Sequence, residues 1–397
     1  MIGTDRVRIA DTFKSVRRIA KELDSTNVKI LSAMWKFGPR NLLEVSRRTG
    51  IPFTSVYHRI SKLQSRSGRV AYLIPQISKL GMLRVVVLAS ARAGSEDQVR
   101  AALKIPNFWW SINSCEGSFT FHSVHAVPVR FFKDFKEYVR QLSRTGLINQ
   151  YRIIATGEQV PNFPSFKYYD PKTNTWRVPW GTWLKELSKT TPAGTITDPE
   201  DYSIVVGRKD LLIIKELEKN ARKRYVELAP IVGVTLQGVK YHYDKILVPK
   251  GIVKNYAFDV YPYPVEVSDY HEIMLEFTND RNLARFYQLI GELFFVLGYS
   301  KILRKNSLLI RTCILQSQLQ KMFAFFSEMA KAGILESYSS VRLSFEGRET
   351  QTISYELFDD KKGWVFDVRH SLSDLRRLIK SKRPLPSRKA IAHQRPI

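Results

Sequence analysis

Residues 50–70 read GIPFTSVYHRISKLQSRSGRV, and this stretch decides the fold. At the period of an α-helix, Phe53, Val56, Ile60 and Leu63 fall on one side, which predicts a helix packed on a small core. The opposite arc is polar and cationic, unlike the mixed Glu and Lys of an ordinary solvated helix. Its members are Thr54, His58, Ser61, Lys62 and Ser65. This composition favours a contact surface.

The flanking segments complete a known motif. Upstream, NLLEVSRRTG (residues 41–50) begins with a capping-box-like Asn41 and Glu44 and stops at Gly50. Downstream, Gly68 closes the second helix, and RVAYLIPQI (residues 69–77) follows as a strand. Helix, glycine turn, helix and strand is the order of a winged helix-turn-helix, whose second helix enters the DNA major groove. For these residues alone, a helical hairpin packed on another surface is the alternative.

The composition indicates a basic, globular protein of several domains. The chain has 397 residues, 44% of them hydrophobic and 12% aromatic, which suggests about two to four domains and argues against disorder. The formal net charge of +26 favours a polyanionic partner, with nucleic acid ahead of an anionic membrane surface. No apolar run reaches the length of a membrane span, and the charged N-terminus does not resemble a signal peptide. We therefore expect a cytoplasmic, nucleoid-associated protein with Cys115 and Cys313 as free thiols.

The chain repeats its own pattern. Gly50 matches Gly233 and Gly68 matches Gly251, at an offset of 183 residues in both cases (233 − 50 and 251 − 68). Between these glycines, every core-facing position stays apolar or aromatic in the second copy. Agreement in both spacing and endpoints indicates an internal duplication.

The segment after each helix pair is also repeated, and it predicts a ferredoxin-like unit. Strand, helix, two strands, helix and strand are expected in the first copy at residues 82–91, 95–105, 108–114, 118–127, 130–146 and 147–156. Residues 270–345 repeat this order, which is the βαββαβ pattern of a ferredoxin-like domain. YYDPKTNTW (168–176) and LFDDKKGW (357–364) suggest a matching extension after each copy.

The predicted fold is therefore α+β, a duplicated winged helix-turn-helix followed each time by a ferredoxin-like βαββαβ domain. An amphipathic helix is expected in residues 1–24, and a basic C-terminal tail follows the second extension. The helix would dock on its own domain or on another chain, and the tail would lie along phosphates or stay disordered. The remaining boundaries are 25–77 and 208–264 for the winged units, 78–160 and 265–350 for the ferredoxin-like domains, 161–207 for the extension and linker, and 351–397 for the extension and tail.

This arrangement resembles the Lrp/AsnC family of feast/famine transcriptional regulators, here in tandem and so expected to be archaeal. The resemblance rests on EVSRRTGIPFTSVYHRISKL (44–63), on the element order and on the repeat. It implies that the second helix of the pair reads DNA. It also implies that the ferredoxin-like domains pair through their sheets, either within one chain as a pseudo-dimer or between chains as a homo-oligomer. The family's effector loop carries Gly-Asp-Tyr/Phe-Asp, whereas SCEGSFTF (114–121) has Ser118 in place of the acid, so no small-molecule effector is assigned.

The predicted DNA contacts divide into two classes. Base reading is assigned to Thr54, His58, Ser61 and Lys62, and phosphate binding to Arg47, Arg48, Arg66 and Arg69. The second copy is less basic, since residues 224–253 carry four cations and two acids (+2) against six and one (+5) in residues 41–70. Pro230 is also expected to interrupt its first helix. An auxiliary DNA-binding role is assigned to Gln237, Lys240 and Lys245.

Enzyme signatures are largely missing from the sequence. No phosphate-binding loop, dinucleotide fingerprint or zinc motif occurs. His122 and His125 stand three apart on a predicted strand, so they face opposite sides and cannot chelate one metal ion together. We therefore predict a DNA-binding transcriptional regulator that is not an enzyme and needs no cofactor or metal, with double-stranded DNA as its partner. Two alternatives stay open: an enzyme similar to the siroheme decarboxylases, which also join a winged helix to a ferredoxin-like domain, and a sequence-neutral chromatin- or RNA-associated protein.

Overall fold

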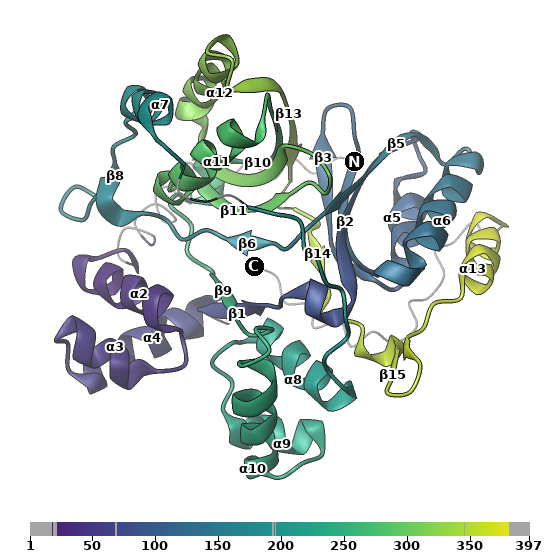
Figure 1. The fold of residues 1–397 in the computed structure, drawn as a ribbon, viewed down its shortest axis with the longest axis horizontal. Helices are drawn as coiled ribbons and strands as arrows, with labels where there is room; N and C mark the ends of the chain where they lie inside the picture. Colours follow the sequence, from purple (N-terminus) through teal and green to yellow (C-terminus); the bar gives the residue numbers. More distant parts are fainter. Residues whose placement is uncertain are drawn as a thin grey trace, which may run out of the picture.

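The computed structural model describes residues 18, 22–67, 70–192, 194, 196–344 and 346–380. Most of the predicted N-terminal helix and the whole basic tail beyond residue 380 lie outside these residues. The described chain is a mixed α+β structure that contains two winged units and two ferredoxin-like units (Figure 1). None of its helices is both long and apolar enough to span a bilayer. The predicted fold class, a duplicated winged helix-turn-helix and ferredoxin-like pair, is confirmed.

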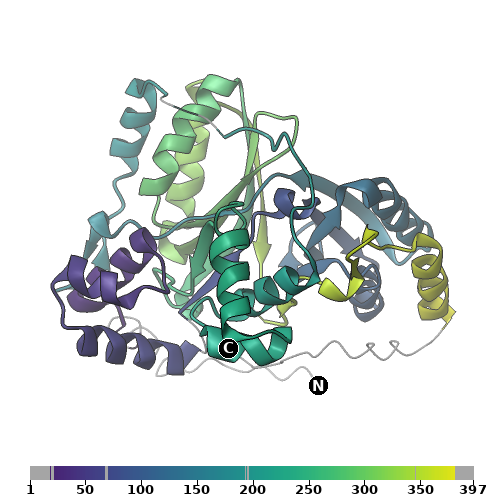
Figure 2. The same ribbon diagram turned by 60° about the horizontal axis from the view of Figure 1, so that its bottom comes forward.

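The two winged units lie on the same side of the molecule (Figures 1 and 2). The first comprises α2 (Ser25–Phe37), α3 (Leu42–Thr49), α4 (Phe53–Ser67) and β1 (Ala71–Ile74). The second comprises α8 (Arg208–Lys219), α9 (Tyr225–Val232), α10 (Leu236–Tyr241), a π-helical turn (His242–Leu247) and β9 (Asn255–Phe258). In both units a glycine with φ of 70°, Gly50 or Gly233, ends the first helix of the pair, because a side chain is disfavoured in that conformation.

The prediction that Pro230 interrupts its helix is wrong. Pro230 lies inside α9, which has eight residues like α3. The ring of Pro230 removes the N–H that would bond the carbonyl of Val226. The helix nevertheless continues to Val232.

The two wings pair with each other. β1 and β9 form an antiparallel ladder from Ala71 opposite Phe258 to Ile74 opposite Asn255. Arg40 reinforces this contact, since its Nη1 donates to the carbonyls of Ala221 at 2.7 Å and Lys223 at 2.9 Å. The winged units are therefore fixed against each other within one chain.

Both ferredoxin-like units have the βαββαβ order. The first is β2 (Met82–Ala91), α5 (Glu96–Lys104), β3 (Trp109–Glu116), β4 (Phe121–Pro128), α6 (Phe132–Arg144) and β5 (Ile148–Thr156). The second is β10 (Ser268–Phe277), α11 (Asp280–Leu289), β11 (Val296–Lys301), β12 (Ser307–Leu315), α12 (Gln316–Lys331) and β13 (Leu335–Leu343). The strand orders are β5-β2-β4-β3 and β13-β10-β12-β11, and the helices of each unit cover one face of its sheet.

The uncovered faces of the two sheets pack on each other. Their edges join where β3 pairs with β13, and again where Thr156 bridges Ile302. Between the sheets lies an apolar cluster with members from both units: Val86, Leu88, Val124, Ile154, Ile302 and Leu309. Of the two pairings left open by the sequence, the structure thus has the pseudo-dimer within one chain.

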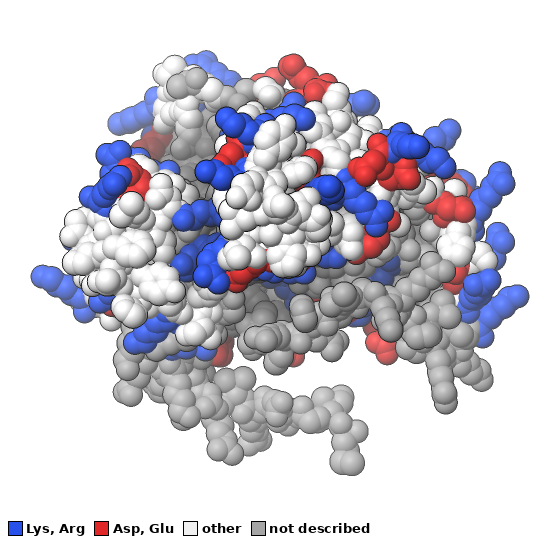
Figure 3. All heavy atoms as spheres, turned by 90° about the horizontal axis from the view of Figure 1, so that it is seen from below, with Lys and Arg blue, Asp and Glu red and all other residues white. Residues whose placement is uncertain are grey.

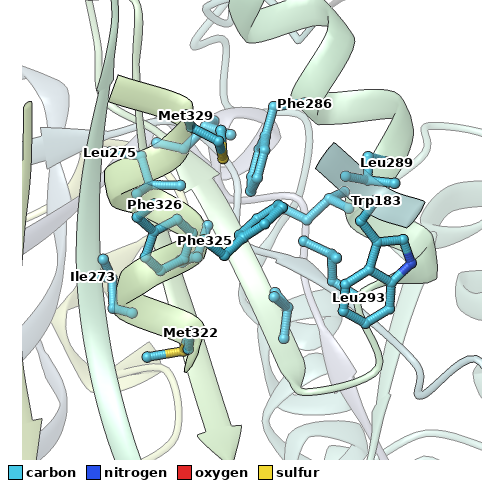
Figure 4. Close-up of a cluster of buried hydrophobic side chains, with 14 of the residues drawn as sticks. Trp183, Ile273, Leu275, Phe286, Leu289, Leu293, Met322, Phe325, Phe326 and Met329 are labelled. Carbon is cyan, nitrogen blue, oxygen red and sulfur yellow. The ribbon is translucent and has the colours of Figure 1, made fainter. Parts of the chain in front are cut away.

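The extension of each unit lies on the other unit. After the first, β6 (Val160–Pro161) pairs with β11, β7 (Tyr169–Asp170) and β8 (Thr175–Trp176) form a hairpin, and α7 (Trp180–Lys189) packs against α11 and α12. After the second, β14 (Glu349–Thr350) pairs with β3, β15 (Phe358–Asp359) and β16 (Gly363–Trp364) form a hairpin, and α13 (Val368–Lys380) packs against α5 and α6. Figure 4 shows Trp183 of α7 in the core of the second unit, near Leu289 and Leu293. This reciprocal exchange ties the halves together.

Candidate functional site

Four charged or titratable side chains project between the two sheets. Arg84 comes from β2, His122 from β4, Glu272 from β10 and Arg311 from β12. Because strand side chains alternate, their neighbours Val85, Phe121, Ile273 and Ile310 point instead into the helix-covered cores. Arg84, His122 and Glu272 are buried, and the side chain of Arg311 is 12% exposed.

Glu272 is the centre of this group. Arg311 Nε donates to Glu272 Oε2 at 2.9 Å, and Arg84 Nη2 lies 3.6 Å from Glu272 Oε1. His122 Nε2 lies 3.9 Å from the same Oε1. Arg84 Nε, Arg311 Nη2 and both ring nitrogens of His122 have no hydrogen-bond partner among the described residues. The group therefore offers more donors than its one carboxylate uses, and buried unpaired donors are rare in folded proteins.

The group of four side chains between the two sheets carries a net positive charge. Burial alone would raise the pKa of Glu272, but Arg311, His122 and Arg84 outweigh it and hold that pKa well below its usual range. Burial lowers the pKa of Arg84 to about 10, which still leaves it protonated at neutral pH. Burial also lowers the pKa of His122. With a neutral imidazole, two guanidinium groups face one carboxylate, so an excess of one positive charge is buried (+2 − 1 = +1).

Two small cavities flank Glu272. The first, of about 20 Å³, has mostly apolar walls, with His122 and Arg152 among its lining residues. The second, of about 10 Å³, is lined by polar groups that include Arg84, Gln159 and Arg311. Glu272 and Leu309 line both cavities. The two cavities are together called the slot below, and their lining residues include apolar side chains and the cationic Arg84, Arg152 and Arg311.

His122 and His125 lie on opposite faces of β4. His122 faces the slot, whereas the ring of His125 packs 4.9 Å from that of Phe135 in α6. Among the described residues, no group of three or more His, Cys, Asp or Glu is arranged to hold a metal ion. Cys115 and Cys313 are free thiols.

The predicted DNA contacts lie at a different place, on the winged units. Thr54, His58 and Lys62 are exposed on α4, and Ser61 is half-buried. Arg47 and Arg48 are exposed on α3, with nitrogens 3.9 Å and 2.7 Å from Glu44. Arg66 falls in α4 but its side chain is not described, and Arg69 lies outside the described residues. Gln237, Lys240 and Lys245 are exposed on the second unit. The DNA roles of all these residues stay predictions.

Large apolar side chains are also exposed on the described surface of the winged units. Figure 3 shows this side with large uncharged areas, and Lys and Arg side chains gather in the seam between the two units. Leu43, Phe53 and Tyr57 are 50%, 45% and 49% exposed on the first unit. Arg59, one of the six cations in residues 41–70, is instead paired with Asp24 at 2.7 Å.

The chain was compared with known proteins and solved structures. No family model matches the chain, and no curated protein matches it. The solved structure of the siroheme decarboxylase NirDL covers 89% of this chain and 97% of its own, at 13% identity and a TM-score of 0.47. Its co-complex with an iron-uroporphyrin III analogue covers 82% and 93%, at 12% identity and a TM-score of 0.46. A transcriptional regulatory protein of the AsnC family from Pyrococcus furiosus covers 34% of this chain and 88% of its own, at 16% identity and a TM-score of 0.27.

These comparisons contradict the prediction of a transcriptional regulator that is not an enzyme. The two NirDL structures, which are titled as a siroheme decarboxylase, cover 89% and 82% of this chain, whereas the AsnC-family regulator covers 34% of it. The sequence evidence for a regulator was the helix-turn-helix and the domain order, which both protein classes share. The resemblance to the Lrp/AsnC family holds for the fold alone.

Arg84, Glu272 and Arg311 were not identified as a site from the sequence. A usable signal was present, because each is a charged residue within a strand rich in apolar residues: MLRVVVLASA (82–91), YHEIMLEF (270–277) and SLLIRTCIL (307–315). Charged residues are rarely fully buried unless they are paired. Which strands would face each other was not readable from the sequence.

Proposed function

We propose that this chain is an enzyme of the siroheme-decarboxylase type. It would bind a planar tetrapyrrole with several carboxylates between its two ferredoxin-like sheets and release carboxyl groups as CO2. The reaction is the one named in the titles of the two NirDL structures, which cover 89% and 82% of this chain. What supports it in this chain is its own residues, above all the buried group of Arg84, His122 and Arg311, which has only one acid.

The slot fits the chemistry of such a substrate. Arginine pairs with carboxylates through two parallel hydrogen bonds, and such charge-assisted bonds are strong where water is excluded. Arg84 and Arg311 each keep a donor nitrogen unused, and Arg152 stands at the exposed end of the larger cavity. Val86, Leu88 and Leu309 would contact the faces of the ring. The net charge of +26 also favours a polyanionic ligand of this kind.

The chemical step requires a proton. Loss of CO2 breaks the bond between the carboxyl carbon and its neighbour and leaves the electron pair on that neighbour, which must then be protonated. His122 is the imidazole that lines the larger cavity. A substrate carboxylate next to it would raise its pKa and favour the imidazolium, which can give its proton to carbon and recover one from water.

The test is incubation of purified protein with siroheme under anaerobic conditions, followed by mass spectrometry of the tetrapyrrole. We expect a product that has lost the mass of one or more CO2 molecules. His122→Phe should reduce this turnover at least about 100-fold, the lower bound for loss of a positioned acid–base group. Arg311→Met should also reduce it, because it removes a guanidinium that would pair with a substrate carboxylate. Lys62→Ala is the control, because Lys62 is exposed on α4, and it should keep full turnover. Unchanged siroheme with the wild-type protein would refute the proposal, and equal activity in all variants would refute the site.

A further inference from the structure

We propose that the Glu272 carboxylate is an internal ligand. It occupies the position between Arg84 and Arg311 that a carboxylate of an incoming ligand would take, and it must leave that position before the ligand can bind. The inference rests on the proposed function for the identity of the substrate. The existence of a carboxylate site at this position can be tested without it.

The contacts of Glu272 are those of a bound carboxylate. One oxygen accepts from Arg311 Nε at 2.9 Å, and the other lies 3.6 Å from Arg84 Nη2 and 3.9 Å from His122 Nε2. The three cationic or donor groups come from three different strands and converge on this one side chain. Arg84 Nε and Arg311 Nη2 remain unpartnered among the described residues, so the cluster has capacity for further carboxylate oxygens.

Glu272 also blocks the slot. The two cavities next to Glu272, of about 20 and 10 Å³, have room for about one water molecule each at most. Since Glu272 and Leu309 line both cavities, rotation of these two side chains would join them. A ligand carboxylate that replaced Glu272 would keep both guanidinium groups paired, so opening the slot would not leave an isolated buried charge.

The first experiment is chemical rescue. Glu272→Ala removes the internal carboxylate and leaves space beside Arg84 and Arg311. We expect a lower melting temperature, and a saturable recovery when sodium propionate is added, but not when sodium chloride is added at equal concentration. Glu276→Ala is the matched control: it lies on the same strand, but its side chain is 29% exposed and 3.9 Å from Lys305. Propionate should leave the melting temperature of Glu276→Ala and of the wild type unchanged.

A second variant covers the case in which Glu272→Ala does not fold. Glu272→Gln keeps the shape of the side chain but removes its charge. Followed by absorbance titration with iron-uroporphyrin III, it should bind about ten-fold more tightly than the wild type, equivalent to about 1.4 kcal/mol. Glu276→Gln should bind like the wild type.

The outcomes separate the two proposals. Equal effects of propionate and chloride on Glu272→Ala, or equal or weaker porphyrin binding by Glu272→Gln, would overturn the internal-ligand inference, even if the wild type decarboxylates siroheme. Propionate rescue in a protein that leaves siroheme unchanged would support the carboxylate site and refute only the proposed reaction.

Discussion

His125 makes the stability of the first ferredoxin-like unit sensitive to acid. Its ring is buried, with Nε2 3.0 Å from Ser123 Oγ and the Phe135 ring on one side. Nδ1 has no hydrogen-bond partner among the described residues. Burial, with a smaller effect from His122, lowers the pKa of His125 from 6.5 to about 3. The folded protein therefore holds this imidazole in its neutral form.

The sign and the size of the pH effect on stability follow from the difference between the pKa of His125 in the unfolded chain and its pKa in the folded chain. Between pH 6.5 and about 3, the unfolded chain binds a proton at His125 that the folded chain does not bind. The contribution of His125 to the free energy of unfolding is therefore fully present above pH 6.5. Below pH 6.5 it decreases by about 1.4 kcal/mol for each unit by which the pH is lowered. At pH 5, which is 1.5 units below 6.5, the loss amounts to about 2 kcal/mol.

The assay is urea unfolding of the wild type and of His125→Phe at several pH values between 7 and 5. Phenylalanine fits the aromatic contact with Phe135 and does not titrate. The difference in unfolding free energy between the two proteins should shift by about 2 kcal/mol in favour of the variant from pH 7 to pH 5. His370→Gln, a change at a side chain that is 49% exposed, serves as the control and should follow the wild type. A difference between wild type and His125→Phe that stays constant over this range would refute the reasoning.

Three further perturbations test two contacts between the halves and the Glu272–Arg311 ion pair within the second half. Arg40→Met removes two bonds to backbone carbonyls of the second winged unit, so we expect a loss of about 1–3 kcal/mol in urea unfolding and faster hydrogen exchange in both wings. Trp364→Phe removes the donor that bonds the Leu80 carbonyl at 2.6 Å and leaves that carbonyl buried, which should cost about 1–3 kcal/mol by thermal unfolding. In a double-mutant cycle, Glu272→Gln alone should cost about 3–5 kcal/mol and Glu272→Gln with Arg311→Met less, while a double-mutant cost equal to the sum of the two single-mutant costs would mean that the pair is not coupled.

The sequence predicted the parts of the fold that depend on local pattern. Val56 and Ile60 are fully buried, as their helical spacing requires, and Gly50 and Gly233 have the left-handed conformation that ends a helix. The βαββαβ order was predicted in the same way from runs of apolar residues. These features depend on neighbours a few positions apart, so one sequence is enough to recognise them.

The site depended on information that local pattern does not contain. Arg84 and Glu272 are 188 residues apart (272 − 84), and they meet only because the two sheets pack face to face. The winged helices, by contrast, present their polar residues on one continuous surface, which made that surface the more visible candidate. Strand patterns show which residues are buried, but they do not show which other strand covers them.

The interior between the sheets is not symmetric, although the two units are. The fifth residue of β2 is Val86, which pairs with Val124 on β4, and the fifth residue of β10 is Glu272, which pairs with Arg311 on β12. An apolar pair therefore suffices at this place in the ladder, and the ion pair is not required to join the strands.

In a homodimer both units would carry the same pair, and two copies of the buried charge would face each other. Duplication within one chain removes that constraint, because each half can change separately. One half of this chain supplies the central ion pair, and the other supplies Arg84, His122 and an apolar wall, which is the arrangement expected of a single asymmetric site.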